Sequence, residues 1–291
     1  MSALVTQTLD FEGAQIYCEA RGSRSVLLLI PGGNGEAAVY RALAESLSDR
    51  FTVVSYDRRG FARSKLASPP DDFRRLDADC RDARFLIDRF GSGSAYVFGS
   101  SSGAIVALEL LTRFPNRIRR LVAHEPPLAT LVPDAPQQLA ILDGVYATYR
   151  ASGAEDAMRK FAAAQGIESG PTLPSGANLD PRVAQMMEMM RHDIEFWLEH
   201  ELRQYPRVTL DLPQLRTVAD RLVLAGGRES RSYFPYRPNT VLAELLHLRV
   251  VDFPGGHVGY ATHPAAFASQ LAEVLLGPSE RYGVRAATDG P

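Results

Sequence analysis

The fold follows from residues 95–111, which read AYVFGSSSGAIVALELL. An apolar run of strand length, Ala95–Phe98, leads into a turn of glycine and serine. Beyond the turn, apolar residues such as Leu108 and Leu111 recur three and four positions apart, which is the period of a helix with one buried face. The stretch therefore predicts a strand, a tight turn and a helix in direct succession.

The alternation of strand and helix continues over most of the chain and is typical of an α/β fold with a mostly parallel sheet flanked by helices. We predict strands at Ile16–Ala20, Val26–Ile30, Thr52–Tyr56, Ala95–Phe98, Leu121–Ala123, Leu222–Ala225 and Arg249–Val251. We predict helices at Ala37–Ser48, Asp77–Phe90, Ala104–Phe114, Thr240–Leu246 and Pro264–Leu276.

Between about residues 128 and 212 the alternation stops, and helical patterns are interrupted by Pro/Gly breaks such as Gly170–Gly176. We therefore expect a core formed by residues 1–127 and 213–276, with residues 128–212 inserted as a helical cap, or lid. Residues 277–291 are rich in Gly, Pro and polar residues, and we expect a disordered tail there.

The charge balance argues against a nucleic-acid-binding protein. The chain has 32 Lys and Arg against 34 Asp and Glu, a formal net charge of −2. Its longest basic runs are pairs such as Arg58-Arg59, whereas duplex-binding proteins neutralise phosphates with clustered Lys and Arg. We expect no nucleic-acid partner.

Cysteine content and apolar runs limit where the protein acts. Two cysteines, Cys18 and Cys80, are too few for a disulfide framework or a zinc-binding quartet, and no H-E-x-x-H motif suggests a metal. The longest apolar run, Val26–Ile30, is too short to span a bilayer, and we find no signal peptide. We expect a cytoplasmic protein with no metal and no membrane partner; its oligomeric state stays open, a homodimer being one option.

The turn Gly99-Ser100-Ser101-Ser102-Gly103 matches the pattern G-x-S-x-G between a strand and a helix. A turn this tight strains the backbone at Ser101, and the small residues on either side let strand and helix approach. It would hold the Ser101 hydroxyl at a helix N-terminus, where backbone N–H groups can stabilise an oxyanion. We predict that Ser101 is a catalytic nucleophile.

A serine nucleophile needs a base, and six histidines are candidates: His124, His192, His200, His247, His257 and His263. His257 lies in the glycine-flanked loop Pro254-Gly-Gly-His-Val-Gly-Tyr260, between the last predicted strand and the last helix. Such a loop emerges at the carboxyl edge of the sheet, where open α/β sheets place their sites. We predict that His257 is the base.

Two glutamates compete to orient the histidine. Glu125 follows the predicted strand Leu121–Ala123, and the two prolines after it would stiffen its backbone. Glu229 follows the strand Leu222–Ala225 among Gly, Arg and Ser, where a surface ion pair is an equally good explanation. We favour Glu125 and keep Glu229 as the alternative acid.

Two other functions compete with a hydrolase that uses Ser101, His257 and a glutamate. Residues 33–38, GNGEAA, match G-x-G-x-x-A between a strand and a helix, and Asp57 ends the next strand, as in a Rossmann-type NAD(P)-dependent oxidoreductase. That interpretation leaves the Ser101 turn and His257 unexplained. A non-catalytic small-molecule receptor on the same scaffold is the second alternative, because a fold does not determine a function.

The cap region contains the single tryptophan, Trp197, and a methionine cluster that includes Met186 and Met190. If the cap covers the carboxyl edge of the sheet, these residues are positioned to contact an apolar ligand, so we predict substrate contacts at all three. Packing of Trp197 as an anchor between cap and core is the competing explanation. The substrate class that we expect is a moderately large apolar ester or lactone.

These motifs resemble those of the α/β-hydrolase superfamily, and the resemblance extends through Leu276. Residues 56–64, YDRRGFARS, are similar to the D-x-R-G-x-G-x-S loop of that family, with Ala62 in place of a glycine. Pro31-Gly-Gly-Asn-Gly35 corresponds to its oxyanion loop, with Pro31 in place of histidine. The resemblance implies a serine hydrolase without a cofactor, acting through an acyl-enzyme, with the N–H groups of Gly33 and Ser102 as oxyanion hole.

More narrowly, Pro31-x-Gly-x-Gly-Glu36, the serine turn and His124-Glu-x-Pro127 resemble the zearalenone-type lactone hydrolases. This resemblance implies a carboxylesterase or lactonase with a Ser-His-Glu catalytic triad whose acid is Glu125. It also implies substrate contact by a cap tryptophan, which here is Trp197. We add Asn34, which follows Gly33 in the same loop, as a substrate-binding residue.

Overall fold

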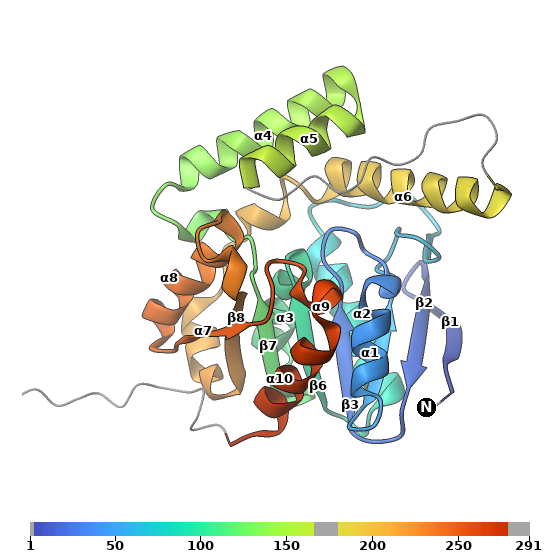
Figure 1. Cartoon of the computed structure of the whole chain (residues 1–291), viewed down its shortest axis with the longest axis vertical. Coiled ribbons are helices and arrows are strands. Elements are labelled where there is room, and N and C mark those ends of the chain that lie inside the picture. The colour runs from blue at the N-terminus through green and yellow to red at the C-terminus, as the bar shows by residue number, and fades with distance from the viewer. Residues whose placement is uncertain (1–2, 166–179, 279–291) are drawn as a thin grey trace, which may run out of the picture.

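The computed structural model describes residues 3–165 and 180–278, and within them the chain forms a nine-stranded sheet flanked by helices (Figure 1). The strand order is β1-β2-β4-β3-β6-β7-β8-β9, with β5 paired to β2. β1 and β5 pair with β2, and β2 with β4, in antiparallel fashion, and every pairing from β4 to β9 is parallel. The strands are β1 Val5–Phe11, β2 Ala14–Arg21, β3 Val26–Ile30, β4 Thr52–Tyr56, β5 Lys65–Leu66, β6 Ala95–Ser100, β7 Ile118–His124, β8 Leu222–Gly227 and β9 Val250–Phe253.

The central strands are apolar on both faces because each face of the sheet is covered by helices. In β3, Leu28 and Ile30 pack into the core beneath α2 (Arg75–Phe90) and α3 (Ser102–Arg113). Leu27 and Leu29 pack into the core beneath α1 (Arg41–Leu47) and α10 (Pro264–Leu276). Successive side chains of a strand point to opposite faces, so one continuous apolar run supplies both cores. Because both faces of β3 are buried, its sequence Val26–Ile30 is apolar throughout and does not alternate with polar residues.

Helices α1 and α10 cover one face of the sheet, and α2, α3 and α8 contribute to the core on the other. The α-helices are α1 Arg41–Leu47, α2 Arg75–Phe90, α3 Ser102–Arg113, α4 Ala135–Ser152, α5 Ala154–Gln165, α6 Pro181–His200, α7 Leu212–Thr217, α8 Arg237–Leu246, α9 Gly259–Thr262 and α10 Pro264–Leu276. Short 3₁₀ helices lie at Ala37–Tyr40, Pro115–Arg117, Ala129–Leu131, Tyr205–Arg207, Ala219–Arg221, Arg228–Ser230 and Phe234–Tyr236.

Helices α4, α5 and α6 follow one another between β7 and β8 and lie across one end of the sheet (Figure 1). In that view α4 and α5 form a green hairpin, and α6, in yellow, runs above the upper ends of the strands. Their shared apolar cluster includes Leu142, Val145, Ala157 and Leu198. These helices therefore have a small apolar core of their own, at one end of the sheet.

The predicted fold class is confirmed, and each of the seven predicted strands is present, with ends that differ by up to three residues. Strands β1 and β5 were not predicted; both pair with β2, at the antiparallel end of the sheet. The expected helix Ala37–Ser48 is divided into a 3₁₀ turn and α1. The Pro/Gly break at 170–176 and nearly all of the expected tail lie outside the described residues.

Among the described residues, no helix is long and apolar enough to cross a membrane.

Candidate active site

Ser101 occupies a strained turn between β6 and α3. Its φ is +56°, a value that residues with a side chain rarely adopt. A Cβ on Gly99 would lie 2.4 Å from the carbonyl oxygen of Gly103, and a Cβ on Gly103 would lie 2.3 Å from that of Ile30. The two glycines therefore allow the close approach of strand and helix that this turn requires.

The glycine loop after β3 packs directly against the serine turn. A Cβ on Gly32 would lie 2.9 Å from Cβ of Ser101, and a Cβ on Gly33 would lie 2.6 Å from Nε1 of Trp197. The loop is thus enclosed between the serine turn and α6. Gly33, Asn34, Ser101 and Ser102 all line the same cavity.

His257 follows β9 and meets Glu125 at the end of β7. Nδ1 of His257 lies 2.6 Å from Oε2 of Glu125, whose other carboxylate oxygen accepts a 2.7 Å hydrogen bond from the backbone N–H of Gly227. His257 also lines the cavity that contains Ser101. The arrangement brings a hydroxyl, an imidazole and a carboxylate to one edge of the sheet.

Glu125 is fully buried and has a φ of +50°, a second strained position beside the site. Burial is the largest single effect and opposes its ionisation, but the hydrogen bond with His257 and the electrostatic interactions with His124 and His257 together outweigh burial, and the pKa of Glu125 falls from 4.5 to about 2. Glu125 is therefore a carboxylate at neutral pH. A buried carboxylate bonded to Nδ1 fixes the imidazole tautomer that leaves Nε2 free to accept a proton.

Glu229 lies in a different position. Its side chain is exposed, and its backbone N–H donates to the carbonyl oxygen of Gly255. The surface ion pair expected for Glu229 does not involve Arg231, because Arg231 pairs with Asp252. Of the two candidate acids, Glu125 is the one that contacts His257.

The remaining histidines have other surroundings. His124 is fully buried next to the site, where Nδ1 lies 3.3 Å from Oγ of Ser100, and burial lowers its pKa from 6.5 to about 4. His192 and His200 lie on α6, where Nδ1 of His200 contacts Asp72 at 2.7 Å. His263 caps α10 and the exposed His247 ends α8.

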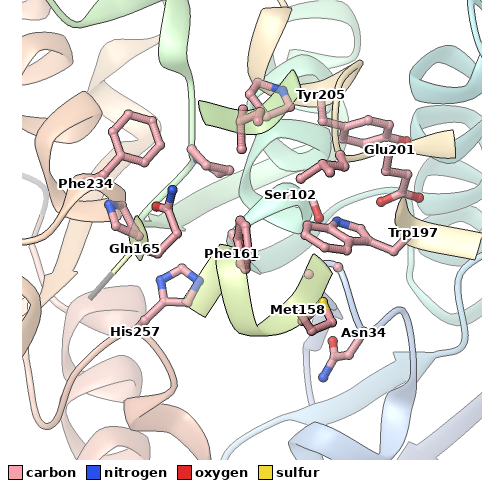
Figure 2. Close-up of a pocket in the computed structure, with 18 of the residues that line it drawn as sticks. Asn34, Ser102, Met158, Phe161, Gln165, Trp197, Glu201, Tyr205, Phe234 and His257 are labelled. Atoms are coloured by element: carbon pink, nitrogen blue, oxygen red, sulfur yellow. The ribbon is translucent and has the colours of Figure 1, made fainter. Parts of the chain in front are cut away.

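The cavity next to Ser101 has a volume of about 270 Å³ and is mostly apolar. Figure 2 shows His257, Phe161 and Trp197 gathered around the same space. Its apolar lining comes from α4, α5, α6, α9 and the loops around them: Pro127, Leu142, Met158, Phe161, Ile194, Trp197, Leu202, Pro206, Phe234, Pro235, Val258 and Tyr260. Such a lining favours an apolar ligand with few polar groups.

The expectation for the two methionines needs correction, because neither Met186 nor Met190 is among the lining residues. Met186 is 49% exposed. At 1.5 Å per helical residue, it lies about 16 Å along α6 from Trp197, and Met190 lies about 10 Å away. The methionine that does line the cavity is Met158, on α5.

Sequence analysis also missed Phe161 and Gln165, which follow Met158 by three and seven positions on α5 and line the cavity. This spacing marks one face of a helix, so helical periodicity was the available signal. That face of α5 lines the cavity. Trp197 is placed both to contact a ligand and to anchor α6, since it lines the cavity and packs against Phe161 with ring centroids 5.1 Å apart.

Asp57, the acid required by the dinucleotide interpretation, is buried and fully engaged. Its Oδ1 accepts from the backbone N–H of Ala37 at 2.8 Å, and both carboxylate oxygens accept from Arg63. A carboxylate held in this way is unavailable to a ribose. The glycine loop packs instead on the serine turn, as a hydrolase requires.

No group of three or more His, Cys, Asp or Glu side chains within residues 3–165 and 180–278 could hold a metal ion.

Comparisons with known proteins found hydrolase relatives that match nearly the whole chain. The chain is 33% identical over 272 residues to the uncharacterized hydrolase YraK of Bacillus subtilis, covering 92% of this chain and 95% of that protein. It is 28% identical to a zearalenone hydrolase of Cladophialophora bantiana, covering 91% and 94% of the two chains.

Solved structures share the fold at low identity. A serine hydrolase from the bacterium Cycloclasticus zankles superposes with a TM-score of 0.73 at 18% identity, covering 94% of this chain and 99% of that chain. The family model described as the alpha/beta hydrolase fold matches residues 25–264. With that match and with hydrolase relatives over nine-tenths of its length, the chain belongs to the alpha/beta hydrolase family.

Proposed function

We propose that the protein is a serine hydrolase that cleaves a carboxylic ester or lactone of a moderately large apolar substrate. Ser101 is the nucleophile, His257 the general base and Glu125 the acid that orients His257. The observation that carries the proposal is the 2.6 Å contact between Nδ1 of His257 and Glu125, in the cavity that Ser101 also lines. We also propose that residues 128–212 form the cap and that the enzyme works in the cytoplasm without a cofactor.

The reaction has two halves. Nε2 of His257 takes the proton of Ser101 as the oxygen attacks the carbonyl carbon, and the tetrahedral oxyanion is held by the N–H groups of Gly33 and Ser102. Collapse of this intermediate breaks the ester bond, and His257 returns the proton to the leaving alkoxide. Water then attacks the acyl-enzyme by the same sequence and releases the carboxylic acid. When the substrate is a lactone, acid and alcohol leave as one ring-opened molecule.

Glu125 supports this cycle electrostatically. Its low pKa keeps it charged while the imidazolium forms, and burial strengthens the interaction between the two groups. The hydrogen bond from the backbone N–H of Gly227 holds the carboxylate in one orientation. This arrangement favours the tautomer with the proton on Nδ1, which a productive base requires.

The substrate class is supported by the cavity lining. Phe161, Trp197 and Phe234 supply aromatic surface, and Met158 supplies a flexible side chain that adapts to ligand shape. Two relatives at 28% and 25% identity are zearalenone hydrolases. We therefore favour a bulky apolar lactone over a short-chain acetate.

A panel of esters and lactones tests the proposal. Purified wild-type protein is assayed with short-chain acetates, aryl esters of longer acids and macrocyclic aryl lactones, with Ser101→Ala as the matched control. We expect turnover to rise with apolar size and to be absent in the control. Tight binding of bulky lactones without hydrolysis would instead identify a receptor, and turnover restricted to acetates would overturn the substrate class.

A further inference from the structure

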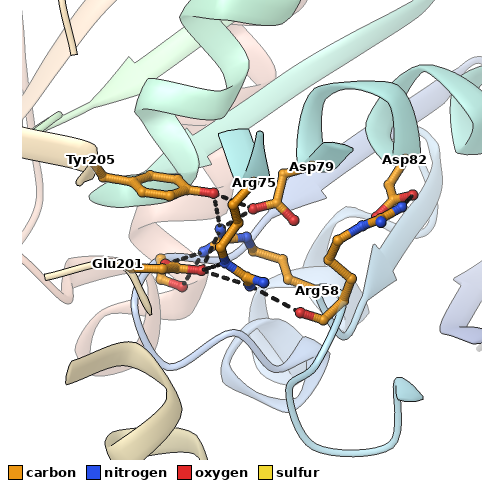
Figure 3. A network of polar contacts seen from close by, with 8 residues as sticks. Arg58, Arg75, Asp79, Asp82, Glu201 and Tyr205 are labelled. Atoms are coloured by element: carbon orange, nitrogen blue, oxygen red, sulfur yellow. Dashed lines mark hydrogen bonds and ion pairs between the residues drawn. The ribbon is translucent and has the colours of Figure 1, made fainter. Parts of the chain in front are cut away.

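Arg58 is fully buried at the junction of the glycine loop, α2 and the end of α6. Its Nη1 donates to Glu201 at 2.9 Å, and its Nη2 donates to Glu201 at 2.8 Å and to the hydroxyl of Tyr205 at 3.0 Å. Asp79, on α2, forms a further ion pair with Nη2 (Figure 3). The motif D-x-R-G-x-G-x-S leaves the position of Arg58 open, so the motif does not account for this network.

One contact of Arg58 reaches the site itself. Nη1 lies 3.2 Å from the carbonyl oxygen of Gly32, which also accepts from the N–H of Gly35 at 3.0 Å. The Gly32 carbonyl and the Gly33 N–H belong to the same planar peptide, and in a trans peptide they point in opposite directions. Holding the carbonyl oxygen therefore aims the N–H of Gly33.

The same guanidinium connects this peptide to α6. Glu201 follows α6 directly, and its backbone N–H donates to the carbonyl oxygen of Trp197 at 2.9 Å. The indole of Trp197 covers Gly33 from the cavity side. Glu201 and Tyr205 also line the cavity. The peptide between Gly32 and Gly33 is thus held on one side by Arg58 and covered on the other by Trp197.

We propose that Arg58 is a positioning residue that holds the Gly32–Gly33 peptide so that the Gly33 N–H points at the developing oxyanion. Its positive charge at the carbonyl end also polarises the peptide and makes the N–H a stronger donor. The inference rests on the proposed function, because the orientation of this N–H affects the rate only if Ser101 attacks a carbonyl. It assigns to the buried network a role in catalysis in addition to joining α6 to the core.

The neighbouring Arg59 provides a matched control. It is also buried, and its Nε donates to Asp82, on α2, at 2.7 Å. Within residues 3–165 and 180–278, its side chain forms hydrogen bonds and an ion pair with Asp82 and none with the glycine loop or α6. Replacement of a residue whose ion pair is purely structural, such as Arg59, should therefore affect stability and not kcat.

The test compares Arg58→Lys with Arg59→Lys in the ester or lactone assay. Lysine keeps the charge but lacks the planar guanidinium, whose two terminal nitrogens donate in fixed directions to Gly32, Glu201 and Asp79. Removing an oxyanion-hole donor outright costs about 10²–10³ in kcat, so we expect misaiming it to lower kcat by about 10–100-fold. KM should stay within about threefold, because the interaction acts mainly in the transition state. Arg59→Lys should lower Tm without changing kcat.

A second measurement distinguishes a change in the orientation of the Gly33 N–H from a change in the packing of the cavity. An aryl boronic acid forms a tetrahedral adduct with the serine, and its affinity should fall in Arg58→Lys by the same factor as kcat. Affinity for a neutral product alcohol should not change. Wild-type kcat and wild-type boronate affinity in Arg58→Lys would overturn the inference, as would an equal loss of kcat in Arg59→Lys.

If Arg58→Lys does not fold, Asp79→Asn decides, because Asp79 holds the same guanidinium but does not line the cavity. We expect a loss of kcat with unchanged KM, and wild-type kcat with a lowered Tm would overturn the inference. Ester hydrolysis in wild type that persists in Ser101→Ala would refute the proposed function itself, so the two failures are distinguishable.

Discussion

The imidazole of His257 and the carboxylate of Glu125 lie 132 positions apart in the sequence, with Nδ1 2.6 Å from Oε2. The two residues follow β7 and β9, and the strand between them, β8, connects them. Glu125 donates its backbone N–H to the carbonyl oxygen of Ala225, and its side chain accepts from Gly227 at the end of the same strand. The pair is therefore anchored where three adjacent parallel strands end.

Replacement of Glu125 by glutamine should nearly abolish hydrolysis. Glutamine keeps the shape of the side chain but removes the charge and can favour the wrong imidazole tautomer. By comparison with triad acids, we expect a fall in kcat of about 10³–10⁴. Steady-state kinetics of Glu125→Gln on the best substrate of the panel measures it.

Glu229→Gln is the matched control, because Glu229 is the other candidate acid and its side chain is exposed. We expect it to retain wild-type kcat within about twofold, because the carboxylate bonded to Nδ1 of His257 is that of Glu125. A large loss in Glu229→Gln with a mild effect at Glu125 would transfer the role of acid to Glu229.

His124 should make folding stability depend on pH in the mildly acidic range. Burial lowers its folded pKa to about 4, whereas the unfolded chain takes up the proton near 6.5. The unfolded state therefore binds more protons between these values, and the stability present above pH 6.5 is lost as pH falls toward 4. The loss amounts to about 1.4 kcal/mol per pH unit, or about 3 kcal/mol in total.

His124→Asn removes this titration and retains a polar group near Oγ of Ser100. Urea unfolding at several pH values between 7 and 4 compares the two proteins. The free energy of unfolding should fall more steeply with acid in the wild type than in the variant. Parallel curves would show that His124 is not held neutral in the folded state.

Trp197→Ala should raise KM for bulky apolar substrates by about tenfold or more, because it removes aromatic surface from the cavity. The packing of Trp197 on Phe161 adds a loss of stability, which for an anchoring aromatic side chain reaches about 3–5 kcal/mol. Kinetics and thermal unfolding of the same variant measure the two effects. Met186→Ala, on the exposed part of α6, should change neither. Unchanged KM in Trp197→Ala would leave Trp197 with the anchoring role alone.

Several features of the fold could be predicted because they depend on local patterns. The run Val26–Ile30 and the turn around Ser101 each have one physical explanation, namely a strand buried on both faces and a close approach of strand and helix. β1 was missed because its residues are mostly exposed or half-buried and its pairing with β2 depends on a tight turn at Glu12 and Gly13, both with positive φ. The pair Glu12-Gly13 is not the Asn-Gly or Asp-Gly pair that marks most two-residue hairpin turns, so the sequence signal was weak.

The candidate site could be predicted only in part. Ser101 and His257 lie in glycine-rich turns whose form is local, whereas the contact of Glu125 with His257 depends on the order of strands in the sheet. The network around Arg58 joins residues up to 147 positions apart, so no local pattern indicates it. Met186 was predicted from composition, but which end of α6 meets the cavity depends on how the helix lies on the core.

The central claim is that Ser101 is the nucleophile, and covalent labelling tests it most directly. Wild-type protein and Ser101→Ala are treated with an alkyl fluorophosphonate, and activity, intact mass and the labelled peptide are determined. We predict one adduct per chain on Ser101 of the wild type, with activity lost in proportion to labelling, and no adduct on the variant. Labelling of the variant to the same extent, or hydrolysis that survives full modification of Ser101, would contradict the account.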